Sequence, residues 1–568
     1  MTIQILDPSL EKEQEIPIYK NNAYIFVGPL RNKDHFCFQC FQDRLKEVEL
    51  DSHYFTYPST MELQASEHDI VTACKNKLKE NEEVPSLYII HREKLKVELQ
   101  STFKRGDCKR CGTDEPDLTP KVGEGTFTKH QLRHETFEKV QKRLEKFRPL
   151  LFGNRPSLIN QITRAGDSYG TPMVQSEVLY KGTSMLSFGR TVTYAISKYT
   201  SILESIERYA TAYPYKKSTE TYQEGESAAI DLTLSEVMKT NNYTNTTGYN
   251  KNLRISYTEV EALHKKSDAL IPEQMVYFNS HKISGEKRYI YDSSNGSALG
   301  STVDEASLHA MLELFERDAF LATWYGKIPP VRIQFDDNSF GNIHDYVDAL
   351  KAKGIQTHLF DISMEMKIPT IWVLLEKEDP QENEMAFYTA AAASLDLEDA
   401  LEKALIEATT AISVFENVFQ NPDDQQRKKY LLDNPHLVTE LEDHLLLYSN
   451  KEMKQAFTFA LASPYQKTPA ELETYYEHFS GSSTRIIEEW HEKIMCISPK
   501  AYRAVIQNPN LTVSGFVNVK YIVPEMLTMT FGHQNRRVVF SRIEKAIRLK
   551  ERGLLDEEWI KSTPHPFP

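Results

Sequence analysis

The sequence predicts a mixed α/β (α+β) protein in which helices pack on mixed sheets, with a small zinc-binding α/β segment at its front. In the second half, helical patterns at 343–353 and 397–416 enclose the strand-like runs IQTHLF and IPTIWVLL. Near the start, the strand-like runs NAYIFVGPL and SLYIIH accompany two Cys-x-x-Cys pairs. The chain has 568 residues, 40% of them hydrophobic, which is enough for roughly two to four domains.

Periodicity and turn-forming residues predict further elements. We expect a helix at 198–213, strands at 275–279 (MVYFN) and 287–292 (KRYIYD), and charged helices through 420–500. The final PHPFP (564–568) has alternate prolines, which cannot continue a helix or a central strand. We therefore expect this tail to form an extended arm.

A turn-rich stretch near residue 120 predicts the domain boundary. The run TDEPDLTPKVGEGT (113–126) is rich in Gly, Pro, Asp and Thr and is typical of a linker. We expect a zinc-binding segment at 1–125 and a large second domain at 127–568.

Four of the six cysteines form two Cys-x-x-Cys pairs, Cys37 with Cys40 and Cys108 with Cys111. Two such pairs can supply the tetrahedral four-thiolate site that Zn²⁺ prefers, and a closed site of this kind is structural. In a cytosolic chain such pairs indicate a metal more often than a disulfide. The alternatives are a redox-active pair or unrelated thiols.

The pattern Glu-x-x-Glu-Arg occurs twice, 109 residues apart, within apolar helical stretches. Residues i and i+3 share a helix face, so Glu204 and Glu207 point the same way, as do Glu313 and Glu316. Carboxylates removed from water need a partner or a cation, and an all-oxygen donor set indicates Mg²⁺. The alternative is a pair of amphipathic helices with solvated Glu–Arg edges, but the repetition and the apolar flanks favour the metal.

A loop of small residues (293–302) precedes the second copy of this pattern and ends in a Ser-Thr pair suited to cap a helix. A helix start of this kind can offer backbone N–H groups to phosphate. Glu305 follows in the first helical turn, eight residues before Glu313. The sequence has no GxxxxGK[ST] motif in this loop, so we expect a nucleotide triphosphate site that is not a P-loop.

Charge and hydropathy exclude some classes of function. A net charge of −14 argues against a general nucleic-acid binder. The sequence contains no run of 18 apolar residues, the length that would predict a membrane span. The acidic N-terminal stretch does not resemble a signal peptide. We therefore expect a cytoplasmic protein that binds neither nucleic acid nor membrane.

Together, these segments resemble the YcaO family. SNGSALGSTVDEASLHAMLELFERDA is similar to the signature of that family, ILESIERYA to an earlier helix, and VPEMLTMTFG to its C-terminal segment. PHPFP resembles the PxPxP tail of the azoline-forming members. The likeness spans about 130–568 and implies the YcaO fold, whereas VGPLRNKDHFCFQCFQDR resembles part of the ThiF-like cyclodehydratase partner with its Cys₄ zinc.

The resemblance implies an ATP-dependent peptide cyclodehydratase. Such an enzyme converts Cys, Ser or Thr of a ribosomally made precursor to thiazoline or (methyl)oxazoline, by phosphorylating the backbone amide oxygen and releasing ADP and phosphate. The product would be a thiazole- or oxazole-containing natural product of the bacteriocin or thiopeptide kind. The implied cofactors are ATP, Mg²⁺ and structural Zn²⁺. The implied partners are the precursor peptide, a separate ThiF-like protein that binds the leader peptide, a second copy of this chain in a homodimer and, as a further candidate, an azoline dehydrogenase.

The resemblance also implies roles for individual residues. The Mg²⁺ ligands would be Glu204, Glu207, Glu305, Glu313 and Glu316. The contacts to ATP and its phosphates would come from Lys129, Thr136, Arg190, Thr200, Asn295, Ser301 and Arg317. The catalytic residues would be Arg317, which would bind the phosphate, and Pro568, whose carboxylate would accept protons in the active site.

Three other functions remain open from the sequence. One is an unrelated Mg²⁺-dependent ATP enzyme, which would not need the PHPFP tail. A YcaO enzyme that forms thioamides would share the ATP site but use sulfide as the nucleophile, and the PHPFP tail and the cysteine pairs favour azolines over it. A non-catalytic scaffold would gather the precursor and its partners, and the five intact glutamates argue against that reading.

Overall fold

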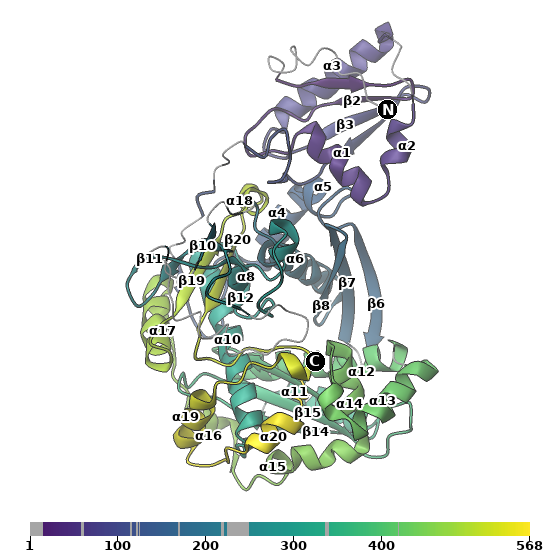
Figure 1. The fold of residues 1–568 in the computed structure, drawn as a ribbon. Helices are drawn as coiled ribbons and strands as arrows, with labels where there is room; N and C mark the ends of the chain where they lie inside the picture. Colours follow the sequence, from purple (N-terminus) through teal and green to yellow (C-terminus); the bar gives the residue numbers. More distant parts are fainter. Residues whose placement is uncertain are drawn as a thin grey trace.

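The N-terminal segment forms its own four-stranded antiparallel sheet in the computed structural model (Figure 1). Apolar clusters pack on both of its faces, one containing Phe26 and Phe41 and the other containing Ile25 and Val71. The strands are β1 (Ile18–Lys20), β2 (Tyr24–Val27), β3 (Leu87–His91) and β4 (Lys96–Gln100), and the helices are α1 (Phe38–Glu47), α2 (Asp51–Phe55) and α3 (Ala65–Glu80). The structure describes residues 15–57, 62–113, 116, 118–120, 123, 125–168, 171–216, 218, 221–223, 226, 249–335, 340–418 and 420–567.

A three-stranded antiparallel sheet follows and reaches toward the C-terminal half (Figure 1). It contains β6 (Gln161–Ser168), β7 (Thr171–Tyr180) and β8 (Thr183–Arg190), and it follows β5 (Thr126–Phe127), α4 (Phe137–Lys146) and α5 (Arg148–Leu151). Helix α6 (Tyr194–Ala212) packs on one face, where the Ser176 hydroxyl bonds to the Ser201 carbonyl and to Ser205. Met173 and Gln175, which point to the opposite face of β7 from Ser176, line a cavity.

A six-stranded sheet carries the centre of the fold. Its main path is β11 (Ser267–Pro272), β10 (Ile255–Ala262), β19 (Tyr502–Ile506), β20 (Val517–Ile522) and β12 (Ser297–Gly300), with β9 (Thr221–Tyr222) on β10. Helix α10 (Val303–Tyr325) begins directly after β12, where the Thr302 hydroxyl accepts the Glu305 N–H as an N-cap. Most of α10 is buried, so this helix forms the central axis of the domain.

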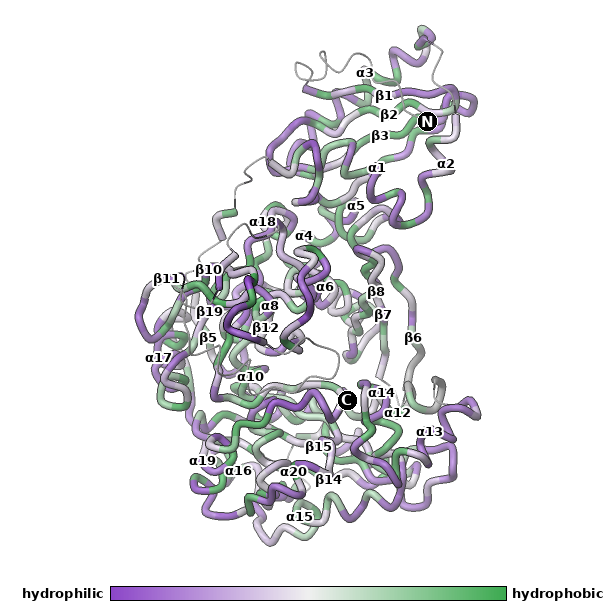
Figure 2. Tube along the Cα trace, in the orientation of Figure 1, coloured by the Kyte–Doolittle hydropathy of each residue, from purple (hydrophilic) through white to green (hydrophobic). Residues whose placement is uncertain are grey.

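A five-stranded sheet forms the C-terminal layer. Its order is β16 (Phe387–Ala393), β15 (Thr370–Lys377), β14 (Ile355–Asp361), β13 (Val331–Ile333) and β17 (Gln466–Lys467). The surrounding helices are α11 (Gly341–Lys351), α12 (Leu397–Val418), α13 (Pro422–Asp433), α14 (Leu441–Tyr448), α15 (Thr458–Leu461), α16 (Pro469–Glu473), α19 (Phe540–Lys550) and α20 (Glu557–Ser562). Figure 2 shows hydrophobic residues along β2 and β3 and hydrophilic residues over the outer helix α13, as expected for buried sheets with solvated helices outside.

The remaining short elements connect these layers. They are α8 (Glu273–Val276), α9 (His281–Ser284), β18 (Gly481–Ser482), α17 (Ser483–Ile497) and α18 (Pro509–Val513), with 3₁₀ turns at Pro435–Leu437, Lys451–Phe457 and His533–Asn535. No helix in the described part of the chain is long and apolar enough to cross a bilayer.

The expected helices at 198–213, 343–353 and 397–416 are confirmed as α6, α11 and α12. The strands expected at 275–279 and 287–292 are wrong, because the first stretch begins inside α8 and the second is irregular. The aromatic residues there are buried in the core without pairing as strands, and the Tyr289 N–H donates to the Gln274 side chain instead of to a neighbouring strand.

A buried arginine joins the N-terminal segment to the rest. Arg44 of α1 is 0% exposed, and its guanidinium donates to the carbonyls of Pro156, Ser157, Leu158 and Leu179. These carbonyls lie before β6 and at the end of β7, so one side chain ties α1 to the three-stranded sheet.

We expect Arg44→Met to lower the free energy of unfolding by about 3 kcal/mol, because four buried carbonyls would lose their donor. Urea unfolding followed by circular dichroism measures this change. Arg485→Met is the matched control, since the Arg485 side chain is 78% exposed and bonds only to a neighbouring glutamate on its own helix. Equal midpoints for the two variants would contradict the role of Arg44.

Candidate active site

A cavity of about 1000 Å³ lies against the face of the β6-β7-β8 sheet that is opposite to α6. Its other walls come from the loop at 291–295, α10, α14 and the segment around Met529 and Phe531. One end carries Arg190, Glu313 and Arg317, and the rest of the lining is an even mixture of apolar or aromatic residues with further charged and polar ones. Such a cavity is large enough for a nucleotide together with a short peptide segment.

The first carboxylate pair lies on α6 beside this cavity. Glu204 accepts the Phe188 N–H at 2.9 Å and pairs with Arg208 at 2.7 Å. Glu207 accepts the Leu299 N–H of β12 at 3.1 Å. Both carboxylates are therefore oriented by backbone groups of neighbouring strands.

The second pair lies on α10, across β12 from the first. The Glu313 side chain is 27% exposed and the Glu316 side chain 14% exposed, and Arg317 lies 3.9 Å and 3.4 Å from them. The predicted pairing of i and i+3 carboxylates on two helices is present in the structure, with the guanidinium of Arg317 beside the second pair.

Burial and mutual repulsion perturb these acids. Loss of water raises the pKa of Glu207 to about 8, and the charges of Glu313 and Glu204 add to the rise. Loss of water also raises the pKa of Glu316 to about 8, with further contributions from Glu407 and Glu313. The two glutamate pairs therefore bring several carboxylates close together, and a bound cation would lower the repulsion between them.

The donor chemistry fits Mg²⁺, because every candidate ligand is a carboxylate oxygen. The carboxylates do not close on one point, however. Among His, Cys, Asp and Glu in the described residues, only the four cysteines bring three or more ligand atoms within 4.8 Å of one another. The glutamates therefore form an open wall whose members would share ions with a ligand that brings oxygens of its own.

Glu407 of α12 is a cavity residue that the sequence reading missed. Its carboxylate lies 3.4 Å from Arg190, and both residues line the cavity. Its charge also contributes to the raised pKa of Glu316. As a single glutamate with no i+3 partner, it gave no pattern to recognise.

Glu305 belongs to a different set of contacts from the other four glutamates. It is 3% exposed, accepts a hydrogen bond from the Ser301 hydroxyl, and is held by the Arg133 guanidinium and the His134 N–H.

Asn295 lines the cavity, and its amide donates to the Met529 carbonyl at 2.6 Å.

Four of the expected nucleotide contacts are not among the residues that line the large cavity, and one of them, Ser301, donates its hydroxyl to Glu305. Lys129 lies 3.9 Å from Asp396 in a second cavity of about 540 Å³. Thr136 caps α4, and the Thr200 hydroxyl donates within α6 to the Ile196 carbonyl. Their expected roles remain predictions.

The C-terminal tail reaches the charged end of the cavity. Phe567 is 1% exposed, and its ring centre lies 4.4 Å from the Arg317 guanidinium carbon and 5.0 Å from the Phe320 ring. Pro568 lies outside the described residues, so the role expected for its carboxylate remains a prediction.

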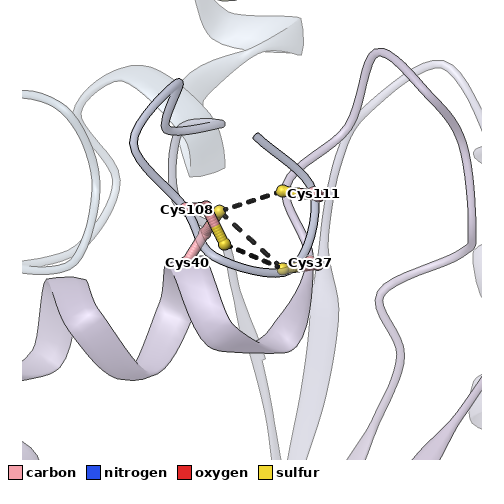
Figure 3. Close-up of side chains that lie close together, drawn as sticks. All are labelled: Cys37, Cys40, Cys108 and Cys111. Atoms are coloured by element: carbon pink, nitrogen blue, oxygen red, sulfur yellow. Dashed lines mark hydrogen bonds between the residues drawn. The ribbon is translucent and has the colours of Figure 1, made fainter. Parts of the chain in front are cut away.

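The cysteine pairs come together as predicted (Figure 3). The sulfurs of Cys37 and Cys108 are 3.5 Å apart and those of Cys40 and Cys111 are 3.4 Å apart. Four sulfurs within 4.8 Å of one another match the donor set of a structural Zn²⁺ site.

Comparison with known proteins identifies the class. The family model for "YcaO cyclodehydratase, ATP-ad Mg2+-binding" matches residues 188–527, which is more than half of the chain. The chain therefore belongs to the YcaO family and is an ATP-dependent cyclodehydratase. A comparison with curated protein sequences finds no match.

Solved structures share the fold. A heterocyclase in complex with substrate and cofactor has a TM-score of 0.64 at 15% identity, covering 92% of this chain and 75% of that chain. The heterocyclase TruD has a TM-score of 0.61 at 15% identity, covering 98% and 76%. YcaO from Methanopyrus kandleri, bound with AMPPCP and Mg²⁺, has a TM-score of 0.50 at 16% identity, covering 70% and 92%. The expected YcaO fold is thus confirmed.

The raised pKa of Glu316 predicts how the protein without Mg²⁺ responds to pH. A carboxyl whose pKa rises from 4.5 to about 8 on folding loses its stabilising contribution as the pH rises through this range. We therefore expect Glu316→Gln to be more stable than the unaltered chain at pH 8.5 by about 2 kcal/mol, with a smaller difference at pH 5.5. Chemical denaturation without Mg²⁺ or ATP measures this, with the exposed Glu489→Gln as control. A constant difference across this pH range would refute the interpretation.

Removing one thiolate should empty the cysteine site. We expect the purified chain to contain equimolar zinc and Cys40→Ser to lose it, with a less stable N-terminal segment. Elemental analysis by mass spectrometry measures the metal. Cys74→Ser is the matched control, because Cys74 is buried in the same segment but lies outside the cluster. Zinc retained by Cys40→Ser would exclude the four-thiolate site.

Proposed function

We propose that the protein converts Cys, Ser or Thr residues of a ribosomally made precursor peptide to thiazoline or (methyl)oxazoline rings, using ATP to activate the preceding amide. The observation that carries this proposal is the charged end of the large cavity, where Glu313 and Arg317 line the wall, Glu316 lies beside Arg317, and the C-terminal tail packs on that guanidinium. The likeness in fold to a heterocyclase in complex with substrate and cofactor supports it.

The reaction needs a leaving group on the amide oxygen. The side-chain thiol or hydroxyl adds to the amide carbon, forming a C–S or C–O bond, and the carbonyl oxygen takes the negative charge. Transfer of the γ-phosphoryl group of ATP to that oxygen releases ADP. Loss of phosphate and of the amide proton then forms the C=N bond of the ring, so that one water leaves the peptide overall.

The acidic and basic residues in and beside the cavity would have different roles in this reaction. Glu204, Glu207, Glu313 and Glu316 would hold Mg²⁺ together with the ATP phosphates, and Glu305 remains a candidate ligand. Bound Mg²⁺ supplies positive charge that neutralises the triphosphate. The guanidinium groups of Arg317 and Arg190 face the same end of the cavity and would stabilise the transferring phosphoryl group.

Two protons must also leave, one from the nucleophile and one from the amide nitrogen. We assign their removal to the carboxylate expected at Pro568, because the tail that precedes it is buried against Arg317. A terminal carboxylate is ionised at neutral pH and can accept a proton.

The N-terminal segment would serve assembly rather than chemistry. Its four-cysteine cluster would bind a structural Zn²⁺, since four thiolates leave no open position for a substrate. We expect a separate ThiF-like protein to deliver the leader peptide in the cytoplasm. The homodimer and the azoline dehydrogenase remain predictions.

The decisive experiment combines the purified chain, a candidate precursor, its leader-binding partner and Mg²⁺–ATP. We expect the peptide to lose the mass of one water per modified residue, with matching phosphate release. Glu316→Gln and removal of 564–568 should each abolish both signals, whereas Glu489→Gln should change neither.

Other outcomes separate the alternatives. A mass gain equal to the replacement of oxygen by sulfur, seen only when sulfide is supplied, would establish thioamide formation instead. No mass change and no ATP turnover with a validated precursor would refute the enzymatic role and leave the scaffold.

A further inference from the structure

Helix α14 contacts both the large cavity and the C-terminal tail. Leu441 and Leu445 of this helix line the cavity. His444 and Tyr448 follow them at helical spacing on the same side of α14 and bond to the backbone carbonyls of His565 and Pro564. The tail therefore packs beside the wall of the cavity that α14 forms.

His444 uses both ring nitrogens, and they must have opposite roles. The Gly532 N–H donates to Nε2 at 3.1 Å, so Nε2 carries no proton. Nδ1 therefore carries the proton of the neutral ring and donates to the His565 carbonyl at 2.7 Å. The residue is fully buried and connects the loop before 533 to the tail.

The His565 side chain completes this contact. Its ring stacks on His444 with centres 4.4 Å apart and planes inclined by 19°. Its Nε2 lies 2.8 Å from the Thr530 carbonyl. The tail is thus recognised through its backbone and through a side chain that stands between two of its prolines.

This contact extends to the charged end of the cavity on two sides. Along the tail, Phe567 follows His565 by two residues and packs its ring on Arg317. Along the loop, the carbonyl of Met529 accepts the amide of Asn295, which lines the cavity. A shift of His444 would therefore disturb Arg317 and the loop at 291–295 together.

We propose that His444 is a positioning residue for the cyclodehydratase reaction, because it holds the tail at 564–567 so that Phe567 fixes Arg317 for phosphoryl transfer. This inference rests on the function proposed above for the cavity.

The arrangement requires a neutral imidazole. A second proton on His444 would place an N–H against the Gly532 N–H in a buried setting. Burial lowers the pKa of His444 to about 4, and the bond to the His565 carbonyl opposes this shift. The titratable groups that face His444 are His533, which lowers the pKa further, Asp443, which raises it, and the stacked ring of His565. Burial, His444 and Arg317 lower the pKa of His565. A group with a lowered pKa is stabilising above its ordinary value of 6.5, so the contact weakens as the pH falls from about 6.5 toward 4.

The test compares His444→Leu with His444→Asn. Leucine keeps the volume but removes both hydrogen bonds, and we expect kcat to fall about 10- to 100-fold, because small misplacements of reacting groups cost about this much. The KM for ATP should stay within about twofold, since the carboxylate wall is untouched. Asparagine restores an N–H donor near the position of Nδ1, and we expect it to recover most of kcat and to flatten the loss of activity below pH 6.5.

One control separates positioning from general damage. His478→Leu alters an exposed histidine and should leave kcat unchanged. An equal loss of kcat in His444→Leu and His444→Asn, or an equal loss in His478→Leu, would overturn the proposal.

Hydrogen exchange at the Phe567 amide gives a readout that needs no precursor. We expect protection in the unaltered chain, fast exchange in His444→Leu and partial protection in His444→Asn. If the unaltered chain shows this protection but processes no peptide, the proposed function fails and the contact stands. Equal exchange in the unaltered chain and His444→Leu would overturn the contact itself.

Discussion

Two helices that present like charges to each other below the surface constrain the whole active site. Burial raises the pKa of Glu207 of α6 and of Glu313 of α10, and the charge of Glu313 raises that of Glu207 further, so the surrounding structure must hold the two carboxylates in place. It does so through β12, whose Leu299 N–H binds Glu207, and through the buried hydroxyls of Thr211 and Ser297, which bond to each other. Rigidity here is a precondition for binding a charged ligand, because flexible acids would turn outward to water.

The sequence was sufficient to predict a group of residues where a short-range pattern coincided with a strong physical requirement. Paired glutamates on apolar helices and paired cysteines each imply a partner, and both groupings appear in the structure. Strands at 275–279 and 287–292 were predicted wrongly, because aromatic runs satisfy a buried irregular segment as well as a strand. Local composition did not distinguish the two.

Long-range contacts could not be predicted from the sequence for a different reason. His444 and His565 are 121 residues apart, His444 belongs to no recognisable motif, and His565 occupies one of the unspecified positions of the PxPxP tail. Glu407 reaches the cavity only because α12 packs against the β6-β7-β8 sheet. The nucleotide contacts expected at Lys129, Thr136 and Thr200 came from resemblance alone, and the structure places these side chains in other contacts.

Arg44 connects the helix that carries Cys40 to the three-stranded sheet, which lies outside the N-terminal segment. Cys40 and Arg44 stand one helical turn apart on α1, so a metal at the four sulfurs would fix the helix whose guanidinium binds the carbonyls at 156–158 and 179. Those carbonyls lie just before β6 and at the end of β7, in the sheet that walls the cavity. If a metal at the cysteine cluster changes the affinity of the cavity for its ligand, thermodynamic reciprocity requires the filled cavity to change the affinity for the metal by the same factor.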